Sequence, residues 1–185
     1  MNTLDCVVES AWHRRDQRLC RLANRWGERR SILQAFGIVS RLGDGIAWYV
    51  LMALLLISGT TAGPQAAVHM AIVSVVACLL YRYLKRWSRR PRPFRRYHDI
   101  IARIAPLDEF SFPSGHTLHA VHFSTVAIAY FPALVVVLVP FAILIAMSRV
   151  VLGLHYPSDV LAATAIGLAL AGGSLGLLPL VAAMG

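Results

Sequence analysis

The alternation of apolar and polar stretches along the chain predicts a protein that crosses a membrane several times. A run from Thr117 to Met147 contains no Lys, Arg, Asp or Glu, and it exceeds the roughly 20 residues that one helix needs to span a bilayer. Pro132 lies midway between His116 and Ser148. Because proline interrupts helices, we expect the run to fold back there into two arms of nearly equal length. The outer ends of both arms then meet at one membrane face.

The other apolar runs predict three more spans, which makes about five in total. The expected spans, with the two hairpin arms as the third and fourth, lie at about 32–58, 66–84, 115–131, 133–152 and 157–182. The first contains Arg41 and Asp44, and charged groups are costly in lipid unless they face protein or water. We expect these two residues to pair structurally near the interface, and a direct catalytic role is the less favoured alternative.

Residues 1–31 are polar and predict an amphipathic helix instead of a span. Trp12, Leu19, Leu22 and Trp26 recur at helical spacing, with arginines at the positions between them. Such a helix either lies on the membrane surface or packs, solvated, on its own domain. We therefore divide the chain into an interfacial segment over 1–31 and a transmembrane domain over 32–185. The expected fold class is an all-α, polytopic helical bundle.

Composition and charge support a membrane location. The chain is 57% hydrophobic and carries a formal net charge of +9, concentrated in seven Arg between 14 and 30 and nine Lys or Arg between 82 and 103. Basic blocks beside spans indicate topology or contact with anionic headgroups, and for 82–103 phosphate binding is an equal alternative. Nucleic acid is a poor partner because no binding fold is visible. The positive-inside rule favours a cell membrane protein whose basic face is cytoplasmic.

Polar residues from three parts of the chain are expected to meet at the shared face. They supply three cations, two imidazoles, one carboxylate and a Ser-Gly turn at a helix start: Lys85, Arg92, Ser114, Gly115, His116, Arg149, His155 and Asp159. Cations beside the free N–H groups of a helix N-terminus form an anion site, for which phosphate is the obvious ligand. The sequence therefore predicts a phosphate-binding site at one end of the bundle.

The two histidines suggest two separate catalytic roles, a nucleophile and a general acid–base. A neutral His155 imidazole can attack phosphorus and form phosphohistidine, with Asp159 as the acceptor that orients its other nitrogen. His116 can protonate the leaving oxygen and then activate water. We expect no metal and no other cofactor, because no multi-carboxylate cage is apparent. His119 and His122 are interpreted as packing residues, with a metal cluster as the less favoured alternative.

These residues also carry a resemblance to a known family. Lys85-x6-Arg92-Pro93, then Pro113-Ser114-Gly115-His116, then Ser148-Arg149-x5-His155-x3-Asp159 resembles the three-part signature of the type-2 phosphatidic acid phosphatase superfamily. The resemblance implies metal-independent hydrolysis of phosphoric esters within a helical bundle. It implies phosphate binding by Lys85, Arg92, Ser114, Gly115 and Arg149. It also implies acid–base work by His116, attack by His155 and orientation by Asp159.

The function we expect is that of a membrane lipid phosphatase. The candidate substrates are phosphatidic acid, phosphatidylglycerol phosphate and polyprenyl phosphates or diphosphates. One alternative is transfer of the phosphate to another acceptor through the same intermediate. The other is a non-enzymatic protein that binds or transports lipid phosphates, although binding alone needs no acid, base or oriented imidazole. The oligomeric state is left open.

Overall fold

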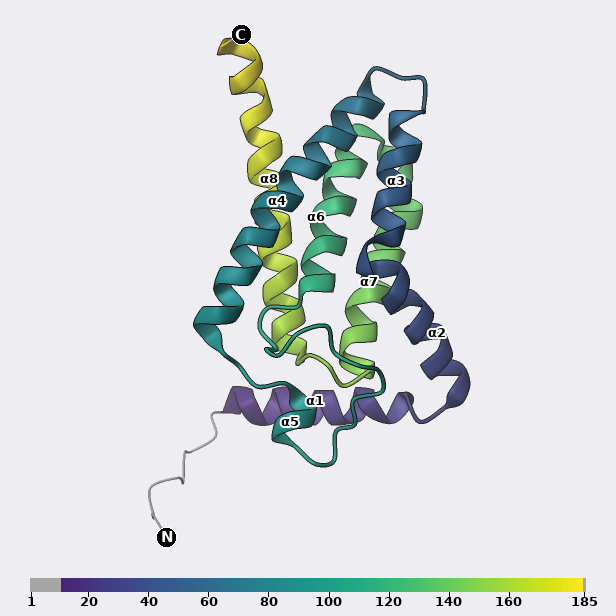
Figure 1. Ribbon diagram of the computed structural model, residues 1–185, viewed down its shortest axis with the longest axis vertical. Coiled ribbons are helices and arrows are strands. Elements are labelled where there is room, and N and C mark those ends of the chain that lie inside the picture. Colours follow the sequence, from purple (N-terminus) through teal and green to yellow (C-terminus); the bar gives the residue numbers. More distant parts are fainter. Residues whose placement is uncertain (1–10, 185) are drawn as a thin grey trace.

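The computed structural model describes residues 11–184 of the chain, and within that range it contains helices and no β-strand (Figure 1). In chain order the elements are α1 (Ala11–Trp26), α2 (Arg30–Arg41), a π-helical turn (Leu42–Ile46), α3 (Ala47–Leu56), α4 (Ala62–Ser88), α5 (Pro93–Arg96), α6 (Gly115–Tyr130), a 3-10 turn (Pro132–Leu134), α7 (Val135–Val151) and α8 (Pro157–Met184). The expected all-α bundle is confirmed.

Four helical stretches in the described part of the chain are long and apolar enough to cross a bilayer. They are Arg30–Leu56, Ala62–Ser88, Pro132–Val151 and Pro157–Leu177. The expected third span is present as α6, but with 16 residues it is shorter than the others, about 24 Å long at 1.5 Å per residue. The expectation of about five spans thus corresponds to four long helices arranged around a shorter one.

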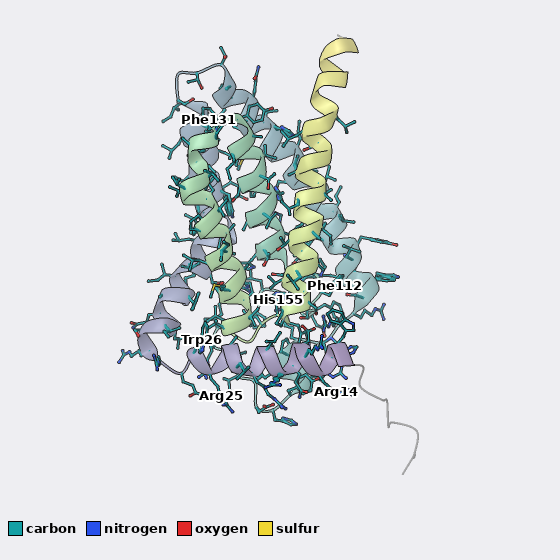
Figure 2. The ribbon with its side chains drawn as sticks, turned by 180° about the vertical axis from the view of Figure 1, so that it is seen from behind. Arg14, Arg25, Trp26, Phe112, Phe131 and His155 are labelled. Atoms are coloured by element: carbon teal, nitrogen blue, oxygen red, sulfur yellow. The ribbon has the colours of Figure 1, made fainter. Side chains whose placement is uncertain are left out.

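The hairpin formed by α6 and α7 reverses where the sequence predicts it. The 3-10 turn begins at Pro132, directly after Phe131. Phe131 lies at the opposite end of the bundle from His155 and Phe112 (Figure 2). Helix α6 occupies the middle of the bundle and packs against α4, α7 and α8 (Figure 1). The N-terminus of α6 and the C-terminus of α7 therefore lie at the same end, beside α1.

The first span is continuous but bent at a glycine. Gly45 has φ 140°, a left-handed value that costs glycine little and other residues more. The bend follows Asp44, whose carboxylate is directed into the bundle and pairs with His116 on α6. The sequence predicts Arg41 as the partner of Asp44, but the partner in the structure is His116, because the bend directs the carboxylate towards α6.

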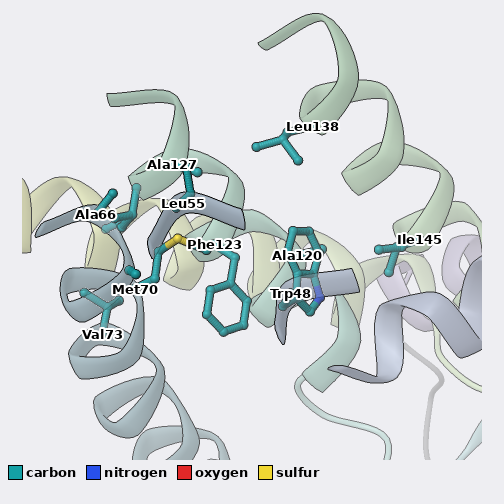
Figure 3. Packing of buried hydrophobic residues seen from close by; sticks show 13 residues of the cluster. Trp48, Leu55, Ala66, Met70, Val73, Ala120, Phe123, Ala127, Leu138 and Ile145 are labelled. Atoms are coloured by element: carbon teal, nitrogen blue, oxygen red, sulfur yellow. The ribbon is translucent and has the colours of Figure 1, made fainter. Parts of the chain in front are cut away.

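The main apolar cluster is built from residues of α3, α4, α6, α7 and α8 (Figure 3). Trp48 from α3 stacks on Phe123 from α6 with ring centroids 5.3 Å apart, and Met70 from α4 packs in the same cluster. An aromatic pair of this kind contributes about 0.5–1.5 kcal/mol beyond the area it buries. This packing fixes the positions of α3, α4 and α6, whose other ends carry polar residues.

Helix α1 lies across the end of the bundle, roughly perpendicular to the long helices (Figure 1). Its inner side buries Asp16, Cys20 and Asn24 against the bundle. The apolar stripe predicted from the sequence does not enter the core, since its members are all about half exposed or more: Trp12, Leu19, Leu22 and Trp26. Thus α1 has a polar inner side, an adjacent exposed apolar stripe and an arginine-rich remainder.

Candidate active site

A polar cavity of about 190 Å³ opens at the end of the bundle covered by α1 and the loop between α5 and α6. Five of the eight predicted site residues line it: Arg92, Gly115, His116, Arg149 and His155. Lys85, Ser114 and Asp159 lie behind this wall and are buried. Residues about 70 positions apart in the sequence are thus brought together, as the hairpin geometry predicted.

His155 sits in the short loop between α7 and α8 and is 1% exposed. Its Nδ1 lies 2.6 Å from the carbonyl oxygen of Ser111 and must donate its proton there. The Nε2 atom is therefore the unprotonated nitrogen, and it accepts a contact from Arg92 Nη1 at 3.3 Å. Burial, followed by the charge of Arg92, lowers the pKa of His155 to about 3. The imidazole is neutral at physiological pH.

The sequence predicts that Asp159 accepts the Nδ1 proton of His155 directly, but in the structure it does not. The Asp159 Oδ2 atom lies 3.7 Å from that nitrogen, beyond hydrogen-bonding distance. Oδ2 instead accepts from the Ser111 hydroxyl and, at 2.9 Å, from the main-chain N–H of Tyr156. Asp159 therefore holds Ser111, and the Ser111 carbonyl orients His155.

Lys85 and Arg92 converge on Asp108, which lies in the loop between α5 and α6 and is not among the predicted site residues. Asp108 Oδ1 accepts from Lys85 Nζ and, at 2.8 Å, from Arg92 Nη2, and Oδ2 accepts from Tyr81 at 2.6 Å. Burial alone would raise the pKa of Asp108, but the hydrogen bonds from Lys85 and Tyr81 lower it to about 2. An ionised carboxylate thus occupies part of the cationic site.

Main-chain carbonyls also hold both cations. Lys85 donates to the Phe110 carbonyl at 2.8 Å, and Arg92 donates to the carbonyls of Leu154 at 2.8 Å and Asp108 at 3.0 Å. These bonds do not depend on the Asp108 side chain. The carboxylate of Asp108 therefore mainly supplies a counter-charge.

Arg149, at the end of α7, faces the same cavity and is 2% exposed. One nitrogen donates to the Ser40 hydroxyl, while its buried Nε has no hydrogen-bond partner among the described residues. A buried guanidinium N–H without an acceptor is costly. Arg149 therefore brings a second buried cation, beside Arg92, to the wall of this cavity.

His116, in the first turn of α6, faces the cavity and pairs with Asp44 through Nε2. Its neighbour Gly115 also lines the cavity, and a Cβ there would lie 2.8 Å from the Tyr81 ring, so only glycine fits. The first N–H groups of a helix have no partner within the helix and favour anions. Ser114, by contrast, turns its hydroxyl inward to Thr117 at 3.0 Å.

His119 and His122 continue up the inner face of α6. His119 Nδ1 and His122 Nε2 are 2.9 Å apart, and His119 also lines the cavity. Within residues 11–184 no group of three or more His, Cys, Asp or Glu is placed to hold a metal ion. The arrangement agrees with a packed histidine pair.

A second, mainly apolar cavity of about 320 Å³ adjoins the polar one and shares Gly43, Asp44 and His119 with it. Its walls come from α3, α4 and α6, and Tyr49 at its edge is 71% exposed. Helices α3 and α4 are joined at the far end and diverge towards the end that carries α1 (Figure 1). The apolar cavity therefore lies between α3, α4 and α6, directly beside the polar one.

Comparison with known proteins adds independent information. The sequence profile described as the PAP2 superfamily matches residues 65–179. The chain is 39% identical to lipid A 1-phosphatase of Rhizobium johnstonii over 50% of this chain and 40% of the relative. It is 36% identical to phosphatidylglycerophosphatase B of Bacillus subtilis over 50% of this chain and 48% of the relative. The matched parts thus span less than half the length of these two relatives.

The same resemblance holds in three dimensions. The crystal structure of LpxE from Aquifex aeolicus superimposes with a TM-score of 0.74 at 28% identity, over 86% of this chain and 93% of the other. The superposition extends beyond the segment matched by the family profile. The fold around the site is therefore shared with that protein.

Proposed function

Because this chain belongs to the PAP2 superfamily, we propose that it is a membrane lipid phosphatase that works through phosphohistidine. The observation that carries the proposal is the state of His155, whose unprotonated Nε2 contacts Arg92 in a cavity that Arg149 and His116 also line. A nucleophile, anion-binding cations and a second imidazole are the groups that phosphoryl transfer requires.

In the first half of the reaction, phosphate oxygens bind to Arg92, Arg149 and the N–H groups at the start of α6. His155 Nε2 attacks phosphorus, a P–N bond forms, and the P–O bond to the lipid breaks. When protonated, His116 gives its proton to the leaving oxygen, and the neighbouring Asp44 stabilises the imidazolium form. In the second half, His116 takes a proton from water and the water oxygen attacks phosphorus. The P–N bond to His155 then breaks and inorganic phosphate leaves.

The adjoining apolar cavity supports a lipid substrate. A phosphate bound beside His155 would leave the rest of the molecule facing this cavity, which is lined by α3 and α4 and by the exposed Tyr49. A hydrocarbon tail can pass there from the bilayer without crossing water. Candidate substrates remain the lipid phosphate monoesters and diphosphates predicted from the sequence.

Asp108 bears on how strongly phosphate binds. Because main-chain carbonyls hold Lys85 and Arg92, removing the Asp108 charge leaves both cations in place but without a competing carboxylate. We expect Asp108→Asn to lower the inhibition constant of inorganic phosphate by about tenfold, the scale of one charge-assisted hydrogen bond. Steady-state kinetics with increasing concentrations of inorganic phosphate measure this inhibition constant. A raised constant would mean that Asp108 orients the cations instead of competing with their ligand.

The proposed function is tested by phosphate release from a panel of lipid phosphates and diphosphates with purified protein in detergent. We expect turnover to persist in a metal chelator, because His155 and the cations supply the nucleophile and the charge stabilisation. Vanadate, which resembles the pentacoordinate phosphorus of the transition state, should inhibit. Turnover that disappears in chelator and returns with added magnesium would contradict the mechanism, and no turnover on any member of the panel would refute the function.

The distribution of charge supports a proposal for the membrane side of the site. We propose that the bundle end with α1 and the site faces the cytoplasm of the cell membrane, because both basic blocks lie at that end. Trp26 lies on the bundle side of α1, and Arg14 and Arg25 on the opposite side (Figure 2). This supports an interfacial helix that rests its apolar stripe on the bilayer surface.

A further inference from the structure

Helix α1 lies outside the segment matched by the family profile, yet its Asp16 reaches into the network behind His155. Asp16 Oδ1 accepts the main-chain N–H of Ser158 at 2.9 Å, and Oδ2 accepts from the Ser158 hydroxyl. Ser158 is the second residue of α8, so this carboxylate from another helix satisfies an N–H at the start of α8. Asp16 is 9% exposed, which is unusual for a carboxylate without a specific partner.

That partner is Arg90, which bridges two carboxylates. Its Nη2 donates to Asp16 at 2.8 Å and its Nη1 donates to Asp159 at 2.6 Å. The guanidinium also lies over the Tyr156 ring, 4.1 Å from the centroid. Arg90 is thereby held from three sides in one orientation. Lysine, with a single nitrogen at its end, could not make both carboxylate contacts in the same way.

The bridge continues to the reactive imidazole. Asp159, held by Arg90, accepts the Ser111 hydroxyl, and the Ser111 carbonyl accepts the Nδ1 proton of His155. Helix α1 makes a second contact nearby, since the Cys20 thiol lies 3.8 Å from the His155 carbonyl oxygen. Burial, followed by the charge of Asp16, raises the pKa of the Cys20 thiol to about 12, so it is a donor.

We propose that Asp16 and Arg90 are positioning residues for His155, and that α1 is therefore part of the catalytic unit. The inference rests on the proposed phosphatase function. Neither residue is among those that line the polar cavity, so both act through Asp159 and Ser111 instead of touching the substrate. The carboxylate of Asp16 orients Arg90, and Arg90 orients Asp159. Asp159 in turn holds Ser111, whose carbonyl orients the imidazole of His155.

A purely structural role for α1 gives a different expectation, and Asn24 provides the matched control. Asn24 is 3% exposed on the same side of α1 and donates to the carbonyls of Ile101 and Val151 at 2.9 and 3.0 Å. It fastens α1 to the bundle through these hydrogen bonds but makes none with Arg90 or Asp159. If α1 served only as an anchor, losing either residue would have the same consequence for turnover.

The experiment compares Asp16→Asn, Asp16→Ala, Arg90→Lys and Asn24→Ala in steady-state phosphate release from a short-chain lipid phosphate. We expect both Asp16 variants and Arg90→Lys to lower kcat about tenfold with KM within about twofold, the loss expected for one charge-assisted hydrogen bond. Asn24→Ala should keep kcat within about twofold of the original protein, even where it lowers the melting temperature. The double variant Asp16→Asn with Arg90→Lys should be no slower than Arg90→Lys alone, because both act through one contact.

Asp16→Asn separates charge from shape. The amide oxygen can still accept from Ser158, but it no longer offers a charge to Arg90. If Asp16→Asn keeps full kcat while Asp16→Ala loses it, the role of Asp16 is to cap α8, and the proposal fails. An equal fall of kcat in Asn24→Ala also overturns it. If Asp16→Ala does not fold, the amide variant and Arg90→Lys still decide the result. Absence of turnover in the unsubstituted protein would instead refute the phosphatase function.

Discussion

Replacing His155 with alanine is expected to lower phosphate release by roughly 10⁴-fold or more on every substrate, as removal of a covalent nucleophile does. The imidazole is buried, and its Nδ1 proton is committed to Ser111, so Nε2 is the nitrogen available for attack. No other unprotonated nitrogen in the described cavity is both oriented by a carbonyl and in contact with Arg92. The loss should appear in kcat, because Arg92 and Arg149 still bind phosphate.

The measurement is phosphate release together with trapping of phosphoenzyme from a radiolabelled substrate at acid-quenched time points. His69→Gln is a suitable control, since His69 is a buried histidine bonded to Tyr130 and Ser174 far from the cavity. The control should retain turnover and phosphoenzyme, whereas His155→Ala should show neither. A folded His155→Ala protein that keeps a tenth of the original rate would exclude His155 as the nucleophile.

His116→Ala is expected to reduce turnover of alkyl lipid phosphates by about 10²- to 10⁴-fold, the usual contribution of a general acid and base. His116 sits at the cavity wall and its imidazolium form is stabilised by Asp44. An alkoxide leaving group needs a proton as the P–O bond breaks. A nitrophenolate leaves readily without one, so the first step of p-nitrophenyl phosphate hydrolysis should be affected far less.

The single-turnover burst of nitrophenolate measures that first step. We expect the burst to survive in His116→Ala while release of the lipid alcohol in a matched single-turnover experiment is strongly slowed. Asp44→Asn should show the same pattern to a smaller degree, because the amide can hold the ring but cannot stabilise its charge. Equal slowing of both leaving groups would place His116 in phosphate binding instead of proton transfer.

Several elements of the fold follow from the chain without knowledge of its neighbours. The apolar run after His116 is too long for one span, and Pro132 can end a helix but not continue one, so α6 and α7 reverse there. Pro157 begins α8 because its fixed backbone angle suits the first helical position. Equal arm lengths then bring His116 and Arg149 to one end. These are consequences of local geometry and of the period of the apolar pattern.

The partners of the site residues could not be obtained in this way. Asp44 was assigned to Arg41, its neighbour on the same helix, but the bend at Gly45 directs it to His116. In the sequence, nothing distinguishes Asp108 and Arg90 from the charged residues around them. In the structure, Asp108 pairs with Arg92 in the cationic site and Arg90 pairs with Asp159. Sequence spacing favoured a direct bond between His155 and Asp159, whereas the loop geometry inserts the Ser111 carbonyl between them.

The sequence by itself determined that this protein is a membrane helical bundle with a set of cations and imidazoles at one end, because hydropathy, helix length and proline act locally. The tertiary structure alone decided which carboxylate faces which cation or imidazole, and that α1 joins the site through Asp16. Such pairings depend on helix rotation, on a bend at a single glycine and on the path of a loop, where an error of one residue turns a side chain by about 100°.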